Sequence, residues 1–171
     1  MTRRGIALVA TAAALAGCGG GSDSDDGSPS PDKPPEASVG RFLGTLPLGY
    51  REAPAPRPDV EQAFKRKVAR DFGASEVVTR NVYLGAQFVA GEIAVRTRRP
   101  LPIATIADKI SPRHIDVRTV KIAGKRAHVV TAVDRAGEPE VTVVETAGPV
   151  VLVVTAQRYP LARKLAARFV R

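Results

Sequence analysis

Apolar residues recur with a helical period early in the folded part of the chain. Four large apolar side chains fall on every fourth position: Val60, Phe64, Val68 and Phe72. This spacing places them on one face of an α-helix. Asp59 is expected to cap the helix, with Gln62 as its capping-box partner, and Gly73 is expected to end it. The pattern therefore predicts an amphipathic helix between residues 59 and 73.

Shorter runs rich in valine, isoleucine and threonine predict strands. These runs span 76–84, 88–97, 115–122, 126–134, 140–145 and 150–156. Residues 39–56 contain several prolines, so they predict an edge strand or an extended entry to the domain. Residues 100–112 predict a crossing segment with a short helix. The run 150–156 is apolar on both faces, which predicts a central strand covered by helices.

The turns and the end of the chain decide the fold class. Glycine-containing turns of hairpin length separate most of the strands, and this favours an antiparallel sheet. Pro160 suits the first turn of a closing helix, whose inward stripe is Leu161, Leu165 and Phe169. The prediction is an α+β domain. It has an antiparallel sheet of about five to seven strands, with a helix from its N-terminal half and a C-terminal helix packed on it.

The first eighteen residues have the three-part pattern of a secretion signal. Arg3 and Arg4 are positively charged, residues 5–16 are apolar, and the sequence Leu15-Ala16-Gly17-Cys18 closes the segment. This stretch resembles the lipobox of bacterial lipoproteins. The resemblance implies cleavage before Cys18, a diacylglyceryl (palmitate-type) thioether on its sulfur, and a domain on the extracytoplasmic side of a bacterial membrane.

Two other interpretations of this segment stay open. Ordinary secretion, with cleavage after Ala14 or Ala16, would leave a free thiol at Cys18. An uncleaved membrane helix would need about 20 apolar residues, and this stretch is shorter. Cys18 is the only cysteine, so the domain contains no disulfide.

Composition divides the chain into three parts. Residues 1–17 are the expected signal peptide. Residues 18–38 are the lipidated cysteine followed by a tether rich in glycine, serine, proline and aspartate, which lacks large apolar residues and is expected to be disordered. Residues 39–171 are expected to form a single domain.

Positive charge is concentrated in the domain. Residues 39–171 hold 23 of the 26 lysines and arginines and 12 of the 17 acidic residues, a net charge of +11. Outside a membrane, this charge favours an anionic lipid, an acidic wall polymer or an acidic protein as partner, rather than nucleic acid. Arg96, Arg98 and Arg99 are the candidate contacts, because alternate residues at a strand end point the same way. Part of the charge is also explained by a compositional bias toward arginine.

The sequence carries no recognisable catalytic motif. His114 and Asp116 could supply two metal ligands, but a zinc site needs at least a third, and His128 lies within a predicted strand. We therefore expect no metal, no cofactor and no enzymatic activity.

The order of the predicted elements is similar to Mog1/PsbP-like lipoprotein domains. That similarity concerns topology and implies no functional residue. The hypothesis is a membrane-anchored, non-catalytic binding or accessory module of the cell envelope. The alternatives are a carrier with an apolar cavity between sheet and helices, and a hydrolase with an unrecognised site.

Overall fold

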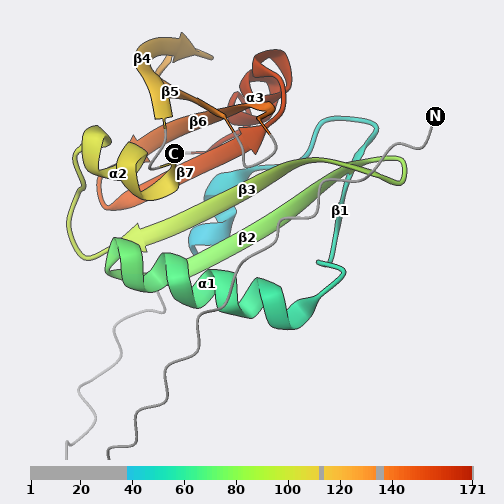
Figure 1. Cartoon of the computed structure of the whole chain (residues 1–171), viewed down its shortest axis with the longest axis horizontal. Helices are drawn as coiled ribbons and strands as arrows, with labels where there is room; N and C mark the ends of the chain where they lie inside the picture. Colours follow the sequence, from blue (N-terminus) through green and yellow to red (C-terminus); the bar gives the residue numbers. More distant parts are fainter. Residues whose placement is uncertain (1–37, 112–113, 134–136, 171) are drawn as a thin grey trace, which may run out of the picture. The chain divides into compact units, whose positions relative to one another are not determined.

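Seven strands form one antiparallel sheet in the computed structural model, which describes residues 38–111, 114–133 and 137–170 (Figure 1). Their order across the sheet is β1-β2-β3-β7-β6-β5-β4. The strands are β1 Tyr50–Ala53, β2 Ala74–Leu84, β3 Gln87–Thr97, β4 His114–Ile122, β5 Lys125–Val133, β6 Pro139–Ala147 and β7 Val150–Ala156. The helices are the 3-10 helix η1 Val39–Leu43 and the α-helices α1 Pro58–Phe72, α2 Ile103–Ile110 and α3 Tyr159–Ala166.

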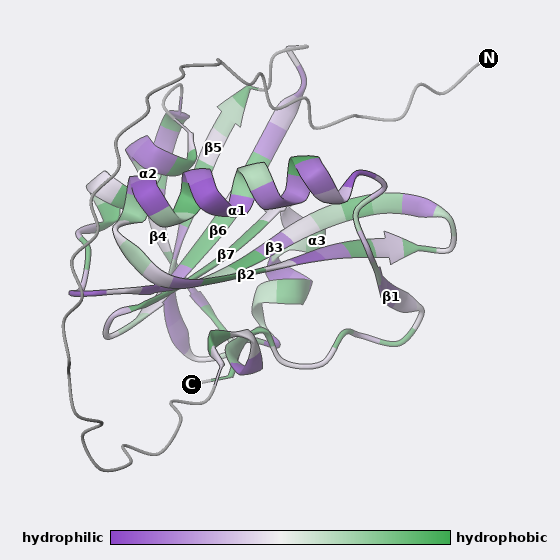
Figure 2. Cartoon of the chain, turned by 90° about the horizontal axis from the view of Figure 1, so that it is seen from below, coloured by the Kyte–Doolittle hydropathy of each residue, from purple (hydrophilic) through white to green (hydrophobic). Residues whose placement is uncertain are grey.

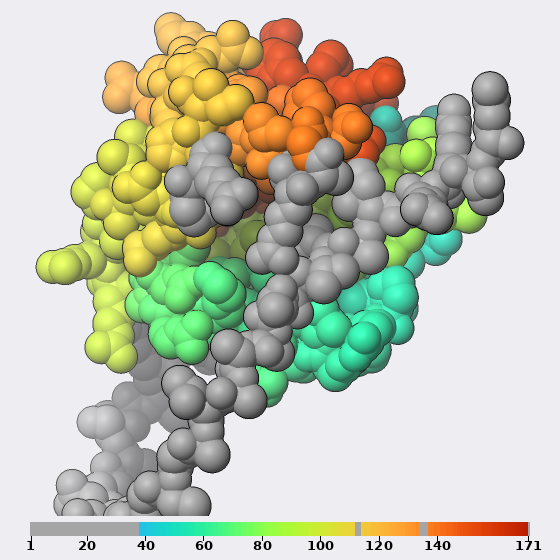
Figure 3. Space-filling view, viewed as in Figure 1, coloured from blue at the N-terminus to red at the C-terminus, as the bar shows by residue number. Residues whose placement is uncertain are grey.

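Helices cover both faces of the sheet. On one face, α1 and α2 pack over a cluster that includes Val95, Val144 and Val153. On the other face, η1 and α3 pack over a larger cluster that includes Leu152 and Leu165. The helices lie on opposite sides of the strands in Figure 2, and Figure 3 shows side chains of α1 (green) and of the region of α2 (yellow) on the near face. The predicted α+β class and antiparallel sheet are confirmed.

Strand β7 lies fourth of seven, at the centre of the sheet, as its continuous apolar run predicts. Val150 to Val154 are all buried, because helices cover both faces here. Strands β3 and β7 pair from Ala90↔Ala156 to Arg96↔Val150, which joins the first half of the chain to the second.

The start of α1 differs from the prediction. The helix begins at Pro58 and its N-cap is Arg57, which makes no side-chain capping bond. Proline is favoured in the first helical turn because its missing N–H has no partner there in any case. Asp59 therefore lies inside the helix, and its carboxylate pairs with Arg57 at 2.7 Å. Gly73 ends the helix in the left-handed conformation, as predicted.

The two ends of the described domain meet. The segment predicted as an extended entry begins with the 3-10 helix η1 and then reaches the edge strand β1. The Val170 amide donates to the Phe42 carbonyl at 2.8 Å, which fixes the segment after α3 against η1. Gly44 lies at this junction with φ +64°, and a Cβ atom there would lie 2.1 Å from the Arg168 carbonyl oxygen.

Candidate functional site

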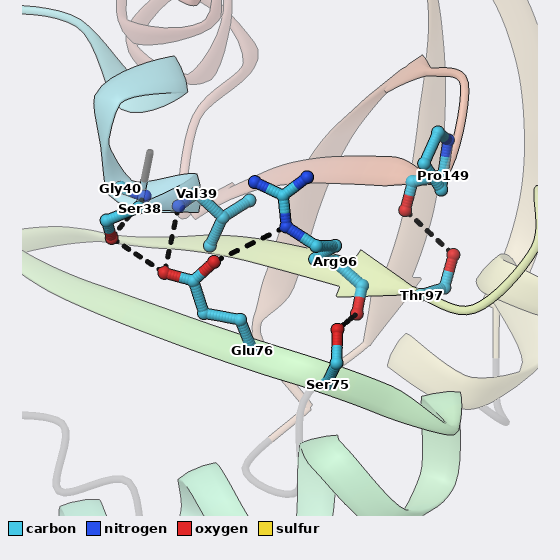
Figure 4. A network of polar contacts seen from close by, with 8 residues as sticks. All are labelled: Ser38, Val39, Gly40, Ser75, Glu76, Arg96, Thr97 and Pro149. Carbon is cyan, nitrogen blue, oxygen red and sulfur yellow. Dashed lines mark hydrogen bonds and ion pairs between the residues drawn. The ribbon is translucent and has the colours of Figure 1, made fainter. Parts of the chain in front are cut away.

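The first described residues are held on the sheet by one carboxylate. Glu76 Oε1 accepts hydrogen bonds from the Ser38 hydroxyl at 2.7 Å and from the Val39 amide at 2.9 Å. Its Oε2 atom lies 3.5 Å from Nε of Arg96, the residue opposite Glu76 on β3. Figure 4 shows these groups converging on Glu76 from η1 and β3. We call Ser38, Val39, Glu76 and Arg96 the root clamp, because the predicted tether ends in sequence at Ser38.

The root clamp depends on the charge of Glu76. Partial burial alone would raise the pKa of this carboxyl. The hydrogen bonds from Ser38 and Val39, together with the Arg96 guanidinium, outweigh burial and hold the pKa below its ordinary value. Glu76 is therefore ionised at neutral pH, which strengthens the bonds that it accepts.

The loop that follows β3 is braced next to the root clamp. Thr97 is buried, and its amide donates to the Pro149 carbonyl at 2.8 Å. Its hydroxyl lies 2.7 Å from both the Pro149 and the Arg99 carbonyl oxygens, so one proton is shared between two acceptors. Arg98 and Arg99 lie in this braced loop, and both are exposed. Two positive side chains thus project from a fixed backbone.

The three arginines predicted as anionic contacts have different surroundings. The side chain of Arg96 is only 20% exposed and pairs with Glu76. Strand β3 ends at Thr97, so Arg98 lies beyond the strand and does not continue its alternation from Arg96. Arg98 and Arg99 make no ion pair with any other residue that the structure describes. The exposed pair Arg98–Arg99 is the part of this group that an external partner can reach.

A buried ion pair ties the other end of η1 to the sheet. Arg80 forms a salt bridge with Glu92, whose side chain is 1% exposed. The Arg80 guanidinium also donates to the Gly44 carbonyl at 2.7 Å and to the Leu43 carbonyl at 2.9 Å. Burial raises the pKa of Glu92 above its ordinary value, although the positive charge of Arg80 opposes the shift. Arg80 and Glu92 therefore position η1, and the root clamp with it.

Sequence reasoning did not single out Arg80, Glu92 or the fully buried Glu145. The alternation of side chains between the two faces of a strand is the signal that could have identified these buried charges. Arg80 alternates with Val82, Glu92 lies between Ala90 and Ala94, and Glu145 follows Val143 by two positions. Each acidic or basic group thus shares one face of the sheet, the face covered by η1 and α3, with buried apolar residues.

The two histidines lie apart from the root clamp. His114 Nδ1 is 2.9 Å from the Ser111 carbonyl oxygen and 3.8 Å from Asp108 Oδ1. His128 Nδ1 is 3.2 Å from the Thr119 hydroxyl, and burial, with a smaller contribution from the charge of Arg126, lowers the His128 pKa. Within residues 38–111, 114–133 and 137–170, no three potential metal ligands cluster.

One surface hollow lies along α3. Its volume is about 350 Å³, and it opens widely to solvent. Its lining consists of Tyr159, Pro160, Arg163, Lys164 and Ala167. The hollow is therefore on the flank of a helix, whereas the predicted alternative of a carrier places a cavity between the sheet and its helices.

Cys18 and the lipobox lie outside the described residues. In the part that is described, no helix is both long and apolar enough to cross a bilayer.

Fold and site together define an α+β domain with helices on both faces and a charged clamp at its first residues. No known family, no curated protein and no solved structure matches the chain. The topological resemblance to Mog1/PsbP-like domains stays a prediction.

Proposed function

We propose that this chain is a lipoprotein anchored through Cys18 to the extracytoplasmic side of a bacterial membrane, where its domain acts as a non-catalytic binding module. The observation that carries the proposal is the fixed placement of two exposed arginines beside the root clamp. Glu76 holds Ser38 and Val39 on the sheet, and Thr97 holds the backbone of the adjacent loop that bears Arg98 and Arg99.

The chemistry of this surface suits an anionic polymer or an acidic protein of the envelope. Arginine presents a planar group that pairs with carboxylate or phosphate through two parallel hydrogen bonds. A braced backbone lowers the entropy lost when the loop binds. Exposed charges at the edge of an interface act mainly by raising the association rate, and salt weakens this effect by screening them.

The anchor is tested by acylation in a bacterial host. Cells expressing the full chain are grown with an alkyne-labelled palmitate, and the purified protein is examined for label and for the mass of its N-terminal peptide. We expect label on Cys18 and recovery in the membrane fraction. Cys18→Ala should lose both, whereas the matched control Ser22→Ala should keep both. An intact, unacylated N-terminus would overturn the anchor.

The anionic contact is tested with a charge-matched pair of variants. Binding of the mature protein to purified envelope fractions is measured at low and high salt. Arg98→Ala/Arg99→Ala should weaken binding at low salt by about tenfold, assuming about 0.7 kcal/mol for each exposed charge. Arg66→Ala/Lys121→Ala removes the same charge from exposed sites on α1 and β4 and should change binding little. Equal losses from both pairs would show that net charge alone matters.

A further inference from the structure

Two exposed leucines lie in adjacent segments at one end of the sheet. Leu48, in the turn before β1, is 99% exposed, and Leu84, at the end of β2, is 49% exposed. Tyr50 pairs with Leu84 in the β1–β2 register, and a Cβ atom on Gly49 would lie 3.9 Å from the Leu84 side chain. The turn before β1 and the β2–β3 hairpin turn meet at the right of Figure 1. We call Leu48 and Leu84 the apolar tip.

Tyrosines and cations surround the apolar tip. The Arg51 guanidinium lies 5.3 Å from the centre of the Tyr83 ring, and its Nε donates to the Gly85 carbonyl at 3.0 Å. Lys164 Nζ lies 4.8 Å from the centre of the Tyr50 ring. One acidic residue, the exposed Glu52, lies next to Arg51 on β1. Apolar side chains, tyrosines and cations at one protrusion are the combination that membrane interfaces favour.

The hollow on α3 adjoins this end of the domain. Lys164 belongs to both, since it lines the hollow and stacks on Tyr50. Arg163 supplies a second cation and Tyr159 an aromatic wall. A phosphate group in the hollow would therefore meet two positive charges close to the apolar tip.

We propose that the apolar tip docks on the outer leaflet of the anionic bilayer that carries the anchor. Leu48 and Leu84 enter the boundary between head groups and acyl chains, while Lys164 and Arg163 bind lipid phosphates. The proposal rests on the lipid anchor at Cys18. It places Arg98 and Arg99 at the far end of the domain, where they face partners away from the membrane.

The length of the predicted tether fits this orientation. Glu76 and Leu84 are eight residues apart on β2, which corresponds to about 26 Å along the strand. A flexible chain of twenty residues, the number of steps from Cys18 to Ser38, has a root-mean-square span of about 25 Å. A tether of that length could therefore reach the root clamp while the apolar tip touches the bilayer. The same tether keeps the domain continuously within reach of that bilayer, which is why a lipid surface is the favoured occupant.

A depth measurement tests the orientation. Cys18 is the only cysteine, and acylation blocks its thiol, so Leu48→Cys gives one free thiol for an environment-sensitive fluorophore. The acylated protein is placed in vesicles of equal parts phosphatidylglycerol and phosphatidylcholine. We expect blue-shifted emission from position 48 and quenching by a lipid-borne spin label. The matched site Ser75→Cys, exposed at the opposite end of β2, should show neither effect.

Each other outcome contradicts docking through the tip. Quenching at position 75 alone would mean that the root clamp faces the bilayer. Quenching at neither position would leave the tip free for a protein partner. The acyl mass of the N-terminal peptide is measured on the same sample, so failure of the anchor is recognised separately.

A second measurement tests membrane binding by the tip in protein that carries no lipid anchor. The chain beginning at residue 18 and carrying Cys18→Ser is sedimented with the same vesicles. Leu48→Ser/Leu84→Ser should reduce the bound fraction about tenfold, because the variant has no leucine side chains at the tip to transfer from water into the bilayer. The control Ile115→Ser changes an apolar residue of β4 that is 69% exposed and should leave binding unchanged. A loss below about twofold for the double variant would overturn the proposal.

Discussion

At the scale of single residues, Gly44 is the described glycine at which an added Cβ atom would meet the closest neighbour. Its φ of +64° and ψ of −172° define a conformation that is essentially restricted to glycine. The Arg168 carbonyl also occupies the space where a side chain would begin. Two independent restraints therefore select glycine here.

Gly44→Ala should lower the free energy of unfolding by about 3 kcal/mol, the sum of backbone strain and overpacking. The matched control is Gly73→Ala, because Gly73 also has positive φ but would bring its Cβ within 4 Å of nothing. The control should cost about 1 kcal/mol. Urea unfolding of both variants measures the difference. Equal costs would mean that the junction of η1 and the C-terminal segment relaxes around the new methyl group.

The partners of the buried charged residues could not be predicted from the sequence. The alternation of side chains along each strand places Arg80 on the same face as Val82 and Glu92 on the same face as Ala90, yet it does not reveal that the two charges lie opposite each other. That pairing follows from the β2–β3 register, in which a shift at Val82 and Tyr83 skips one residue. The hydrogen bonds to Leu43 and Gly44 depend further on where η1 docks, which no local pattern encodes.

At the scale of elements, the short helix η1 depends on the charged and apolar contacts that it makes with the rest of the domain. It has five residues, too few to be stable alone, and it is fixed by Glu76 at its start and by Arg80 at its end. Because the pKa of Glu76 is lowered in the folded state, its contribution is complete above the ordinary value of 4.5. The contribution is lost as the pH falls through the lowered pKa.

Glu76→Gln should therefore destabilise the domain by about 1 kcal/mol at neutral pH, a value discounted for the partial exposure of the site. The difference between wild type and variant should shrink as the pH falls below 4.5. Chemical unfolding at several pH values tests this. Asp116→Asn, at an exposed position on β4, should stay within about 0.5 kcal/mol of wild type at neutral pH. A difference for Glu76→Gln that grows with acidity would contradict a lowered pKa.

Most elements were predictable from local patterns. The strand runs, their glycine turns, the short helix in the crossing segment and the closing helix were all found, because periodicity and turn residues are local signals. The closing helix ends at Ala166, however, so Phe169 is buried as predicted but lies beyond the helix. The entry segment was less predictable. Its 3-10 helix depends on Val39 and Leu43 finding a place in the same buried cluster as Leu165 of α3, which is a tertiary effect. The predicted cap at Asp59 was wrong because the helix starts at Pro58, and its N-cap, Arg57, lies two residues before Asp59.

At the scale of the whole molecule, the β3–β7 pairing joins two halves that are distant in sequence. Ala90 and Ala156 pair although 66 positions separate them, whereas the hairpins on either side are local. The central strands are also buried on both faces, while β1 and β4 form the two edges of the sheet. Stability should therefore decrease from the centre toward both edges.

Hydrogen exchange measures this gradient. We expect amides of β7, Val151 to Val154, to exchange only through global unfolding, and amides of β1 to exchange at least about a hundredfold faster. Strand β4 should exchange faster than its neighbour β5. Uniform protection across the sheet would show that the edges open only together with the centre.

The hydrogen bond between the Val170 amide and the Phe42 carbonyl has a practical consequence. Since the ends of the domain adjoin, a short peptide could link them and new termini could be opened in the β4–β5 turn at Gly124, giving a circular permutant with the same topology. For the same reason, a fluorescent protein fused to the C-terminus would lie near η1, where the domain begins. Such a fusion is therefore poorly placed to detect binding at the apolar tip.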